Sequence, residues 1–479
     1  MVNNYHYISR RIFLLLAGFV FLSISFPFVS NAYTIDVNIK GYNNAEVYLG
    51  LYYGESHFVV DSAFTNSNGY AQFYSKASLQ QGVYFVAIPP YSRFELLILE
   101  DQNFSVYTDI QKILGNLTLT NYDDSDLFIS MQLEIASLNI KQSQLDMKKQ
   151  FFEHSGLSDS VKNVKKSLDL LSDARNEIYA KYLDLDMDGF LSKMIEMILP
   201  PVFSENVLQL KYNNPNAYYN YYKMHFFDRV DFSDSRILYT PDFVFHRLLN
   251  EYCTFFLDAN VNNRDTVCND VDVLISQSSI NQEVNQYVIS FLTANYATPS
   301  VQGMDAVFVY LADNYYKQGK VPWVDSTVIH AVLSEADLLR YNLVGNSAID
   351  IQLSDTTDAT LSLHQIDSKY TILWFWEPDC VSCEQQTPIL QENYAQLKKY
   401  GVEVVAVYTG TDKDLWIDYL RETNTQWINL YDPQQNSFMY KYYGTSKTPR
   451  LFILNREKII LAKDISPEYL VPYLKYFEK

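Results

Sequence analysis

Positive charge is scarce in this chain of 479 residues, which has 37 lysines and arginines against 56 aspartates and glutamates. The formal net charge of −19 argues against nucleic-acid binding, because neutralising phosphates requires clustered lysine and arginine side chains. Charged residues make up only 19% of the chain and hydrophobic residues 48%, a balance that excludes wholesale disorder. The chain is too long for one core, so we expect roughly two to four domains.

Cysteine does not occur before Cys253, and its absence near the N-terminus excludes a lipid-anchored lipoprotein. Arg10 and Arg11 precede an apolar run over residues 12–29, which small residues follow up to Ala32. This pattern is typical of a signal peptide. We therefore predict a signal peptide over residues 1–32 and export to the periplasm or cell envelope. The run is also long enough to span a bilayer, so an uncleaved membrane anchor stays open as the minority alternative.

Short runs rich in tyrosine, valine and phenylalanine alternate with polar residues between residues 33 and 121. Asn68-Gly69 lies between two of these runs and is a strong signal for a β-hairpin. Seven such runs predict an all-β, sandwich-like domain. No acid pair or metal-ligand cluster occurs in it, so we expect a docking or structural role.

The pattern changes near Asp123, after which apolar residues recur every three or four positions. This spacing predicts a helical domain over residues 122–342, whose separate helices are divided at prolines such as Pro215 and Pro241. No repeat period is visible in it.

Two of the four cysteines, Cys253 and Cys268, lie fifteen residues apart in this helical region. They lack the paired spacing of a zinc site, and His246 is the only imidazole nearby, so we expect no metal there. Two interpretations stay open. A structural disulfide is favoured for an exported protein, and the alternative is two separate buried thiols.

The other two cysteines follow a wholly apolar run over residues 370–376, in a region (343–479) where strands and helices alternate. Such alternation, ending in an antiparallel hairpin, predicts a mixed sheet covered by helices. Cys380 stands at the predicted start of a helix, where free peptide N–H groups stabilise a thiolate. Cys383 lies one turn further on, where it can attack a mixed disulfide formed by Cys380. We therefore predict that the pair is catalytic and forms a redox-active disulfide.

Four features of this region resemble the thioredoxin fold, and in particular the exported thiol–disulfide oxidoreductases of the TlpA/ResA type. They are Phe375-Trp376, Cys380-Val381-Ser382-Cys383, Pro388 and Thr448-Pro449. The resemblance implies that Pro449 is cis, belongs to the catalytic site, and holds the backbone beside the cysteines. It also implies that Trp376, Thr448 and Pro449 bind the substrate polypeptide.

Two positions depart from the pattern of that family. Asp379 stands where most members have tryptophan, and its carboxylate opposes a thiolate on the next residue. Gln386 stands where members often have an acidic residue. The upstream regions are similar to accessory domains of unknown function that precede such domains in exported proteins of Gram-negative gut bacteria, as the run over residues 228–243 suggests.

Taken with the signal peptide, the resemblance implies an exported enzyme that reduces protein disulfides by dithiol–disulfide exchange. Its expected partners are protein thiols and disulfides and a membrane electron donor, and no cofactor is expected. An oxidase or isomerase would use the same residues. A different class of function is an envelope binding or scaffold protein with an accessory or inactive thioredoxin-like domain. Nothing in the sequence indicates the oligomeric state.

Overall fold

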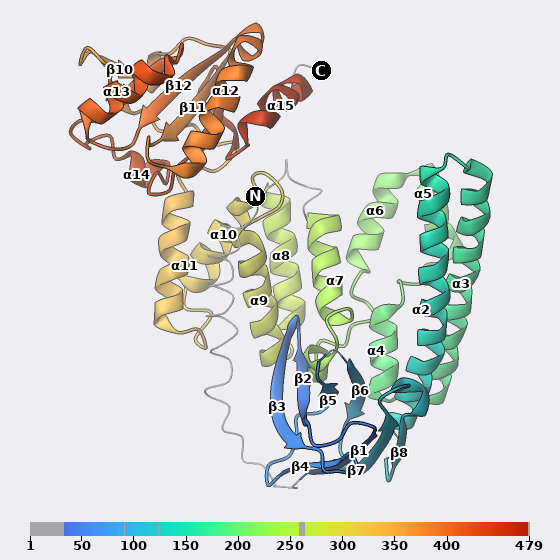
Figure 1. Cartoon of the computed structure of the whole chain (residues 1–479). Helices are drawn as coiled ribbons and strands as arrows, with labels where there is room; N and C mark the ends of the chain where they lie inside the picture. The colour runs from blue at the N-terminus through green and yellow to red at the C-terminus, as the bar shows by residue number, and fades with distance from the viewer. Residues whose placement is uncertain (1–32, 91, 123, 258–263, 478–479) are drawn as a thin grey trace. The chain divides into compact units, whose positions relative to one another are not determined.

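A computed structural model describes residues 33–90, 92–122, 124–257 and 264–477 (Figure 1). The predicted signal peptide over residues 1–32 lies outside these described residues. The chain forms two compact units. The first contains residues 33–256 and Ser276–Tyr287, and the second contains Leu257–Ile275 and the chain from Val288 onward. The predicted domain boundaries stay predictions, since these units divide the chain within the helical region. No helix among the described residues is both long and apolar enough to cross a bilayer.

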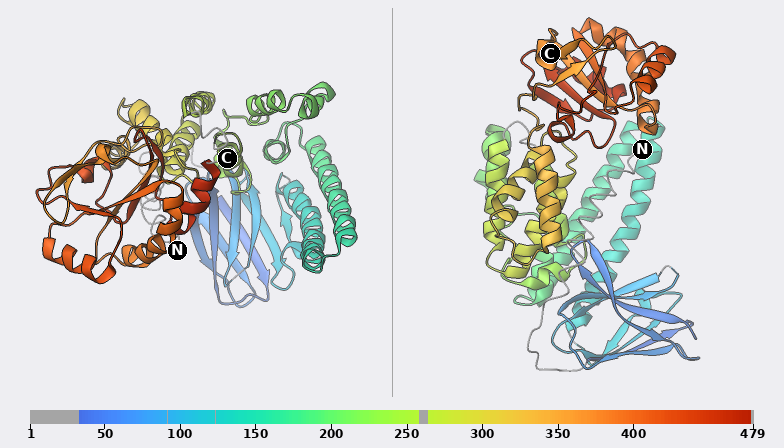
Figure 2. Two further views of the ribbon diagram at one scale, coloured as in Figure 1. Left: turned by 90° about the horizontal axis from the view of Figure 1, so that it is seen from above. Right: turned by 90° about the vertical axis from the view of Figure 1, so that its left-hand side faces the viewer.

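The first unit begins with a β-sandwich, as predicted, built from two four-stranded sheets (Figure 2). One sheet has the order β4-β1-β7-β8. Its strands are β1 (Tyr33–Lys40), β4 (Tyr70–Ser75), β7 (Asn103–Asp109) and β8 (Thr118–Thr120), with the short helix η2 (Leu114–Asn116) between the last two. The other sheet has the order β3-β2-β5-β6. Its strands are β2 (Glu46–Tyr53), β3 (Ser56–Phe64), β5 (Gly82–Ile88) and β6 (Ser92–Ile98).

The two sheets differ in how their strands are covered. Six of the seven residues of β5 are buried, so this strand is covered on both faces, whereas no residue of β3 at the edge of the same sheet is buried. In β1 and β4 burial alternates from residue to residue, so the sheet β4-β1-β7-β8 buries one face and leaves the other open to solvent. The hairpin predicted at Asn68-Gly69 is wrong, because β3 and β4 belong to different sheets and the chain crosses from one sheet to the other there. Asn68-Gly69 does form a tight turn, and Gly69 has a φ of 79° that suits glycine.

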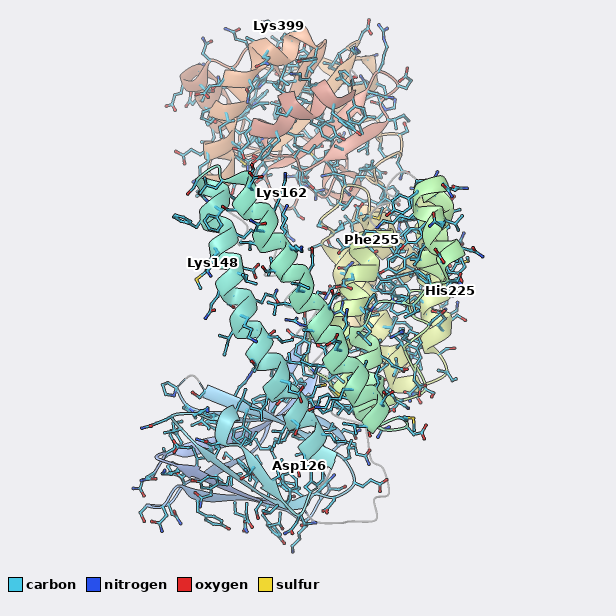
Figure 3. The ribbon with its side chains drawn as sticks, turned by 90° about the vertical axis from the view of Figure 1, so that its right-hand side faces the viewer. Asp126, Lys148, Lys162, His225, Phe255 and Lys399 are labelled. Carbon is cyan, nitrogen blue, oxygen red and sulfur yellow. The ribbon has the colours of Figure 1, made fainter. Side chains whose placement is uncertain are left out.

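The central region is helical, as predicted. Its longest helices, α2 (Asp124–His154) and α3 (Ser158–Leu185), form an antiparallel pair. Figure 3 shows Asp126 at the sandwich end of this pair and Lys148 and Lys162 toward its other end. The shorter helices up to residue 257 are α4 (Phe190–Ile198), α5 (Glu205–Asn213), α6 (Pro215–Met224), η3 (Ser235–Tyr239), α7 (Phe245–Tyr252) and the π-helical turn η4 (Cys253–Leu257). Those that follow are α8 (Arg264–Ser278), α9 (Gln282–Ala297), α10 (Asp305–Leu311), the π-helical turn η6 (Ala312–Tyr316) and α11 (Ser326–Leu339).

The C-terminal region is a seven-stranded mixed sheet with the order β10-β9-β13-β12-β11-β14-β15, consistent with the thioredoxin fold. Central strand β11 is parallel to β12 and antiparallel to β14. The strands are β9 (Gln352–Ser354), β10 (Thr360–Ser362), β11 (Tyr370–Trp376), β12 (Val402–Tyr408), β13 (Ile428–Tyr431), β14 (Arg450–Asn455) and β15 (Ile460–Lys463). The helices are η7 (Leu363–Gln365), α12 (Val381–Lys399), α13 (Lys413–Thr423), α14 (Met439–Tyr442), η8 (Pro467–Tyr469) and α15 (Leu470–Phe477).

Every residue of β11 is buried, because both faces of the sheet are covered. Ile372, Trp374 and Trp376 point to the face that α12, α13 and α15 cover, whereas Leu373 and Phe375 point to the face that α14 covers. The wholly apolar run is therefore the sequence that a strand with two covered faces requires. This arrangement holds the C-terminal end of β11 rigidly in place, and the cysteine motif follows directly from it.

The favoured disulfide between Cys253 and Cys268 is a prediction that the structure corrects. Each of these residues is a buried thiol. Cys253 is 1% exposed and Cys268 is 6% exposed, so each fills core space as a small hydrophobic side chain. Burial, with a smaller contribution from Asp265 and Asp272, raises the pKa of Cys268 to about 11, which disfavours the thiolate that disulfide formation needs.

Candidate active site

Cys380 occupies the N-cap position of α12, four residues beyond the end of β11. Its φ of −88° and ψ of 111° are those of an extended residue, which directs its side chain back over the first turn of the helix. The backbone N–H of Cys383 donates a hydrogen bond to the Cys380 sulfur over 3.3 Å. A peptide N–H at a helix start stabilises negative charge, so this geometry favours a Cys380 thiolate.

Thr448 and Pro449 lie directly beside Cys380, although they are almost seventy residues away in the sequence. The Cys380 thiol donates a hydrogen bond to the Thr448 carbonyl oxygen over 3.3 Å. The Thr448-Pro449 peptide bond is cis, as the resemblance implied. The structure thus brings together four of the five predicted site residues, Cys380, Cys383, Thr448 and Pro449.

The two cysteines differ sharply in their access to solvent. Cys380 is partly exposed, whereas Cys383 is 1% exposed and belongs to the core of the domain. Burial raises the pKa of the Cys383 thiol well above its usual range, and the neighbouring Cys380 raises it further. The outer cysteine can therefore meet a partner, while the inner one stays protonated until a reaction reaches it.

Trp376, the fifth predicted site residue, lies behind the cysteines rather than on the surface. Its side chain is 2% exposed, and its ring packs on Tyr419 of α13 with centroids 4.5 Å apart. The Trp376 side chain therefore offers almost no exposed surface for the substrate binding that the resemblance implied. A Phe-Trp pair that ends a strand buried on both faces is explained by packing.

Tyr419 is the residue near the site that the sequence analysis missed. Burial raises the pKa of its phenol, the Thr387 hydroxyl opposes this rise, and Cys383 adds to it. The phenol is therefore a neutral hydroxyl close to the buried cysteine. Thr387 lies one helical turn after Cys383 and is also buried. No local pattern marks Tyr419, because it reaches the site from a helix that begins thirty residues later.

The structure shows where the acidic residues near the cysteine motif lie, which the sequence alone did not reveal. Glu377 is half-buried and accepts a hydrogen bond from the Thr409 hydroxyl over 2.5 Å. Asp379 is exposed, and Gln386, which stands at the acidic position of the family pattern, is half-buried. Glu377 is thus tied to the loop after β12.

In the part of the chain that the structure describes, the side chains around the cysteines offer no site for a metal ion. There, no group of three or more histidine, cysteine, aspartate and glutamate side chains is placed to hold a metal ion. An open hollow of about 550 Å³ lies near the other end of α12 and is lined by Tyr394, Lys398, Glu403 and Trp427. It begins eleven residues after Cys383, so it is not part of the cysteine site.

Two parts of the chain match known protein families. Residues 367–460 match the thioredoxin-like family, and residues 207–342 match a domain of unknown function, DUF5106. A curated relative is the thiol-disulfide oxidoreductase ResA of Bacillus subtilis (strain 168), which is 26% identical over 113 residues. That match covers 24% of this chain and 62% of the relative.

Two further proteins are similar over other shares of the chain. The ResA of Oceanobacillus iheyensis is 33% identical over 87 residues, which is 17% of this chain and 45% of that protein. The chain thus spans less than two thirds of each of these two ResA relatives. The crystal structure of a thioredoxin-like protein from Bacteroides caccae has 20% sequence identity and a TM-score of 0.44, and covers 58% of this chain and 98% of that one. The chain therefore carries a thioredoxin-like domain related to the ResA thiol–disulfide oxidoreductases, preceded by a DUF5106 domain of unknown function.

Proposed function

We propose that this protein is an exported thiol–disulfide oxidoreductase that reduces disulfides in other proteins. The observation that carries the proposal is the asymmetry of the cysteine pair. Cys380 is partly exposed and accepts a hydrogen bond from the Cys383 N–H at the helix start, whereas Cys383 is buried as a thiol one turn further on. Such a pair suits a two-step exchange in which only the first cysteine meets the partner.

In the first step the Cys380 thiolate attacks one sulfur of a partner disulfide. The partner's S–S bond breaks, its released thiolate takes up a proton, and a mixed disulfide joins Cys380 to the partner. In the second step Cys383 loses its proton and attacks the Cys380 sulfur. The partner leaves as a second thiol, and two electrons have moved from the Cys380–Cys383 dithiol to the partner.

The Thr448 carbonyl oxygen and Pro449 are proposed to position the partner. The Thr448 oxygen lies 3.3 Å from the Cys380 sulfur, so a polypeptide that reaches this sulfur passes over the Thr448-Pro449 backbone. The cycle also needs a dithiol that reduces the Cys380–Cys383 disulfide again. A membrane electron donor is proposed for this role, because the predicted signal peptide over residues 1–32 would remove the protein from the cytoplasmic thiol pool.

Reduction of insulin by the purified protein tests the enzyme proposal. With excess dithiothreitol we expect the wild-type protein to accelerate insulin reduction at least tenfold over dithiothreitol alone, as an active dithiol does. The Cys380→Ser variant should show no acceleration, because it lacks the attacking sulfur. Cys268→Ala is the matched control, since it removes a thiol that lies outside the motif. Equal rates for wild type and Cys380→Ser would favour the scaffold alternative instead.

The direction of electron flow needs a second measurement. Equilibration with glutathione buffers, followed by thiol alkylation, gives the reduction potential of the Cys380–Cys383 pair. A reductase should lie well below the roughly −120 mV of strongly oxidising dithiol proteins. A value near −120 mV would assign the protein to the oxidases. Trapping partners on a Cys383→Ala variant would then name the substrates, because the mixed disulfide at Cys380 cannot be resolved.

A further inference from the structure

The solvent-exposed face of the sheet β4-β1-β7-β8 carries a group of polar and aromatic side chains that take no part in the proposed thiol exchange. Figure 1 shows β1, β4 and β7 on the side of the sandwich turned away from α4 and α7 of the same unit. Side chains of alternate residues on these strands point away from the core. Three of them are exposed tyrosines, namely Tyr70 at 39%, Tyr74 at 55% and Tyr107 at 43%.

Strand register arranges the outward side chains in rows across the sheet. One row runs Tyr70, Asn38, Tyr107 and Thr118. The next runs Gln72, Asp36, Ser105 and Thr120, and the third runs Tyr74, Thr34 and Asn103. Two strand spacings separate Tyr70 from Tyr107, which is about 10 Å, and four residues of β4 separate Tyr70 from Tyr74, which is about 13 Å.

Hydrogen bonds hold part of this face in a fixed arrangement. The Tyr70 hydroxyl donates to a carboxylate oxygen of Asp36 over 2.6 Å, and the Gln72 side-chain amide donates to the same oxygen over 2.9 Å. Because Asp36 lies on the neighbouring strand, the Tyr70 side chain extends along the sheet instead of standing away from it. The ring then offers a flat apolar surface, with acceptor and donor groups beside it.

The composition of these rows limits what they can bind. None of the outward positions in the three rows is aliphatic or basic, and Asp36 is the only charged residue among them. Aliphatic side chains and lysines would be needed for an anionic lipid surface, and basic side chains for a nucleic acid. Tyrosine rings among hydroxyl and amide groups instead match a neutral ligand with apolar C–H faces and many hydroxyl groups. Sugar rings have this combination.

We propose that the face formed by Tyr70, Tyr74, Tyr107 and the polar residues between them binds a neutral polysaccharide. Sugar rings stack on the tyrosines, and their hydroxyl groups exchange hydrogen bonds with Asn38, Gln72 and Asp36. Separations of about 10 and 13 Å between tyrosines fit a chain of several sugar units better than a single sugar. This activity is independent of the proposed thiol chemistry and would attach the protein to a glycan.

Native gels that contain soluble polysaccharides test the proposal with the purified protein. The panel comprises amylopectin, mixed-linkage β-glucan, xyloglucan, galactomannan, arabinoxylan and α-mannan, with alginate as the anionic control. We expect at least one neutral polysaccharide to retard the protein, and alginate to leave it unretarded. Tyr74→Thr and Tyr107→Thr should each weaken binding about tenfold through loss of a stacking ring, since threonine keeps the strand propensity.

Two controls distinguish the loss of a stacking ring from a general effect of the substitutions on folding. Tyr74→Phe and Tyr107→Phe keep the ring and should retain binding within about threefold. Tyr212→Thr removes a tyrosine that is 78% exposed on α5 and should change nothing. The proposal is overturned if no neutral polysaccharide retards the protein, if alginate alone does, or if the Tyr74→Thr/Tyr107→Thr double variant binds like wild type. It is also overturned if light scattering shows that this double variant converts a dimer to a monomer, because the face would then pair with a second copy.

Discussion

Tyr419 supplies a neutral hydroxyl on the buried side of the cysteine pair, where the family pattern often has an acidic residue. In this chain Gln386 occupies that acidic position, so no carboxylate stands there to accept the proton of Cys383. The Tyr419 ring packs on Trp376, and Cys383 is among the groups that raise the pKa of its phenol, after burial. A neutral phenol can donate a hydrogen bond to the Cys383 thiolate that forms during the second exchange step.

Replacing Tyr419 by phenylalanine should therefore slow the resolution of a mixed disulfide. Loss of a hydrogen bond to a charged group costs about 1.5–3 kcal/mol, so we expect resolution about tenfold slower or more. The pH at which resolution reaches half its maximal rate should rise, because the Cys383 thiolate loses a stabilising donor. Stopped-flow decay of a Cys380–glutathione mixed disulfide across pH 7–10 measures both the rate of resolution and its dependence on pH.

A packing role for Tyr419 predicts a different result. In that case the Phe variant, which keeps the ring on Trp376, would resolve the mixed disulfide with the wild-type rate and pH profile. The rate at which Cys380 attacks a disulfide serves as the internal control, since Cys380 lies on the exposed side of the pair. A variant that slows both steps equally would also argue against a specific role for the hydroxyl.

At the scale of elements, the short helix η3 joins the β-sandwich to the helices of the first unit. Its residues Ile237, Leu238 and Tyr239 are buried, and the Leu238 carbonyl oxygen accepts a hydrogen bond from the Gly54 N–H at the end of β2. Asp234 caps this helix by accepting from the Arg236 N–H, and it pairs with the side chains of Arg236 and Lys193. The run over residues 228–243 is thus a structural junction.

Asp234 should make the first unit sensitive to acid. Burial raises the pKa of Asp234, but Arg236 and Lys193 outweigh that effect and lower it to about 2. Between about pH 4 and pH 2 the unfolded chain then binds more protons than the folded chain. The free energy of unfolding of the first unit therefore falls as the pH falls through that range. Asp234→Asn should cost about 2 kcal/mol at pH 7 and should lose this acid dependence.

Calorimetric unfolding between pH 2.5 and 7 checks the prediction for Asp234. All five tryptophans, from Trp323 to Trp427, lie in the second unit, so tryptophan fluorescence identifies the transition that belongs to that unit. Asp242→Asn is a matched control, because Asp242 is an exposed carboxylate in the same run. Equal acid dependence in wild type and Asp234→Asn would contradict the assignment.

At the scale of the whole molecule, the thioredoxin-like sheet is tied to helices that precede it. Lys463 of β15 is 7% exposed and forms an ion pair with Asp305 of α10, which is 4% exposed. Its ammonium also donates to the Asn342 side-chain oxygen over 2.9 Å, and its carbonyl oxygen accepts from Gln302 over 2.8 Å. The second unit therefore includes α10 and α11, upstream of the predicted boundary at residue 342.

A double-mutant cycle on Lys463 and Asp305 tests this connection. Asp305→Ala leaves a buried ammonium without its counter-ion and should destabilise the second unit by about 3–5 kcal/mol. Adding Lys463→Met should recover most of that loss, because no buried charge remains. Urea unfolding followed by tryptophan fluorescence gives both values. Costs that simply add would show that the two side chains do not interact.

Much of the secondary structure was predictable from local patterns. The bounds of β11 coincide with the wholly apolar run over residues 370–376, because such a run is typical of a strand with both faces covered. Pro215 marks the start of α6, where a missing N–H costs no hydrogen bond. β8, with three residues, was not predicted, since so short a run has no periodicity to detect.

The sequence by itself determined the cysteine motif at a helix start, the β, helical and mixed α/β regions, and the pairing of Cys380 with Thr448-Pro449. The last of these rested on a family resemblance, because nothing local connects residues so far apart. Only the tertiary structure decided that Cys253 and Cys268 are buried thiols, that Trp376 is buried, and that Tyr419 stands beside Cys383. Apolar periodicity reports which side chains leave water, but the partner that each one meets depends on how distant elements pack.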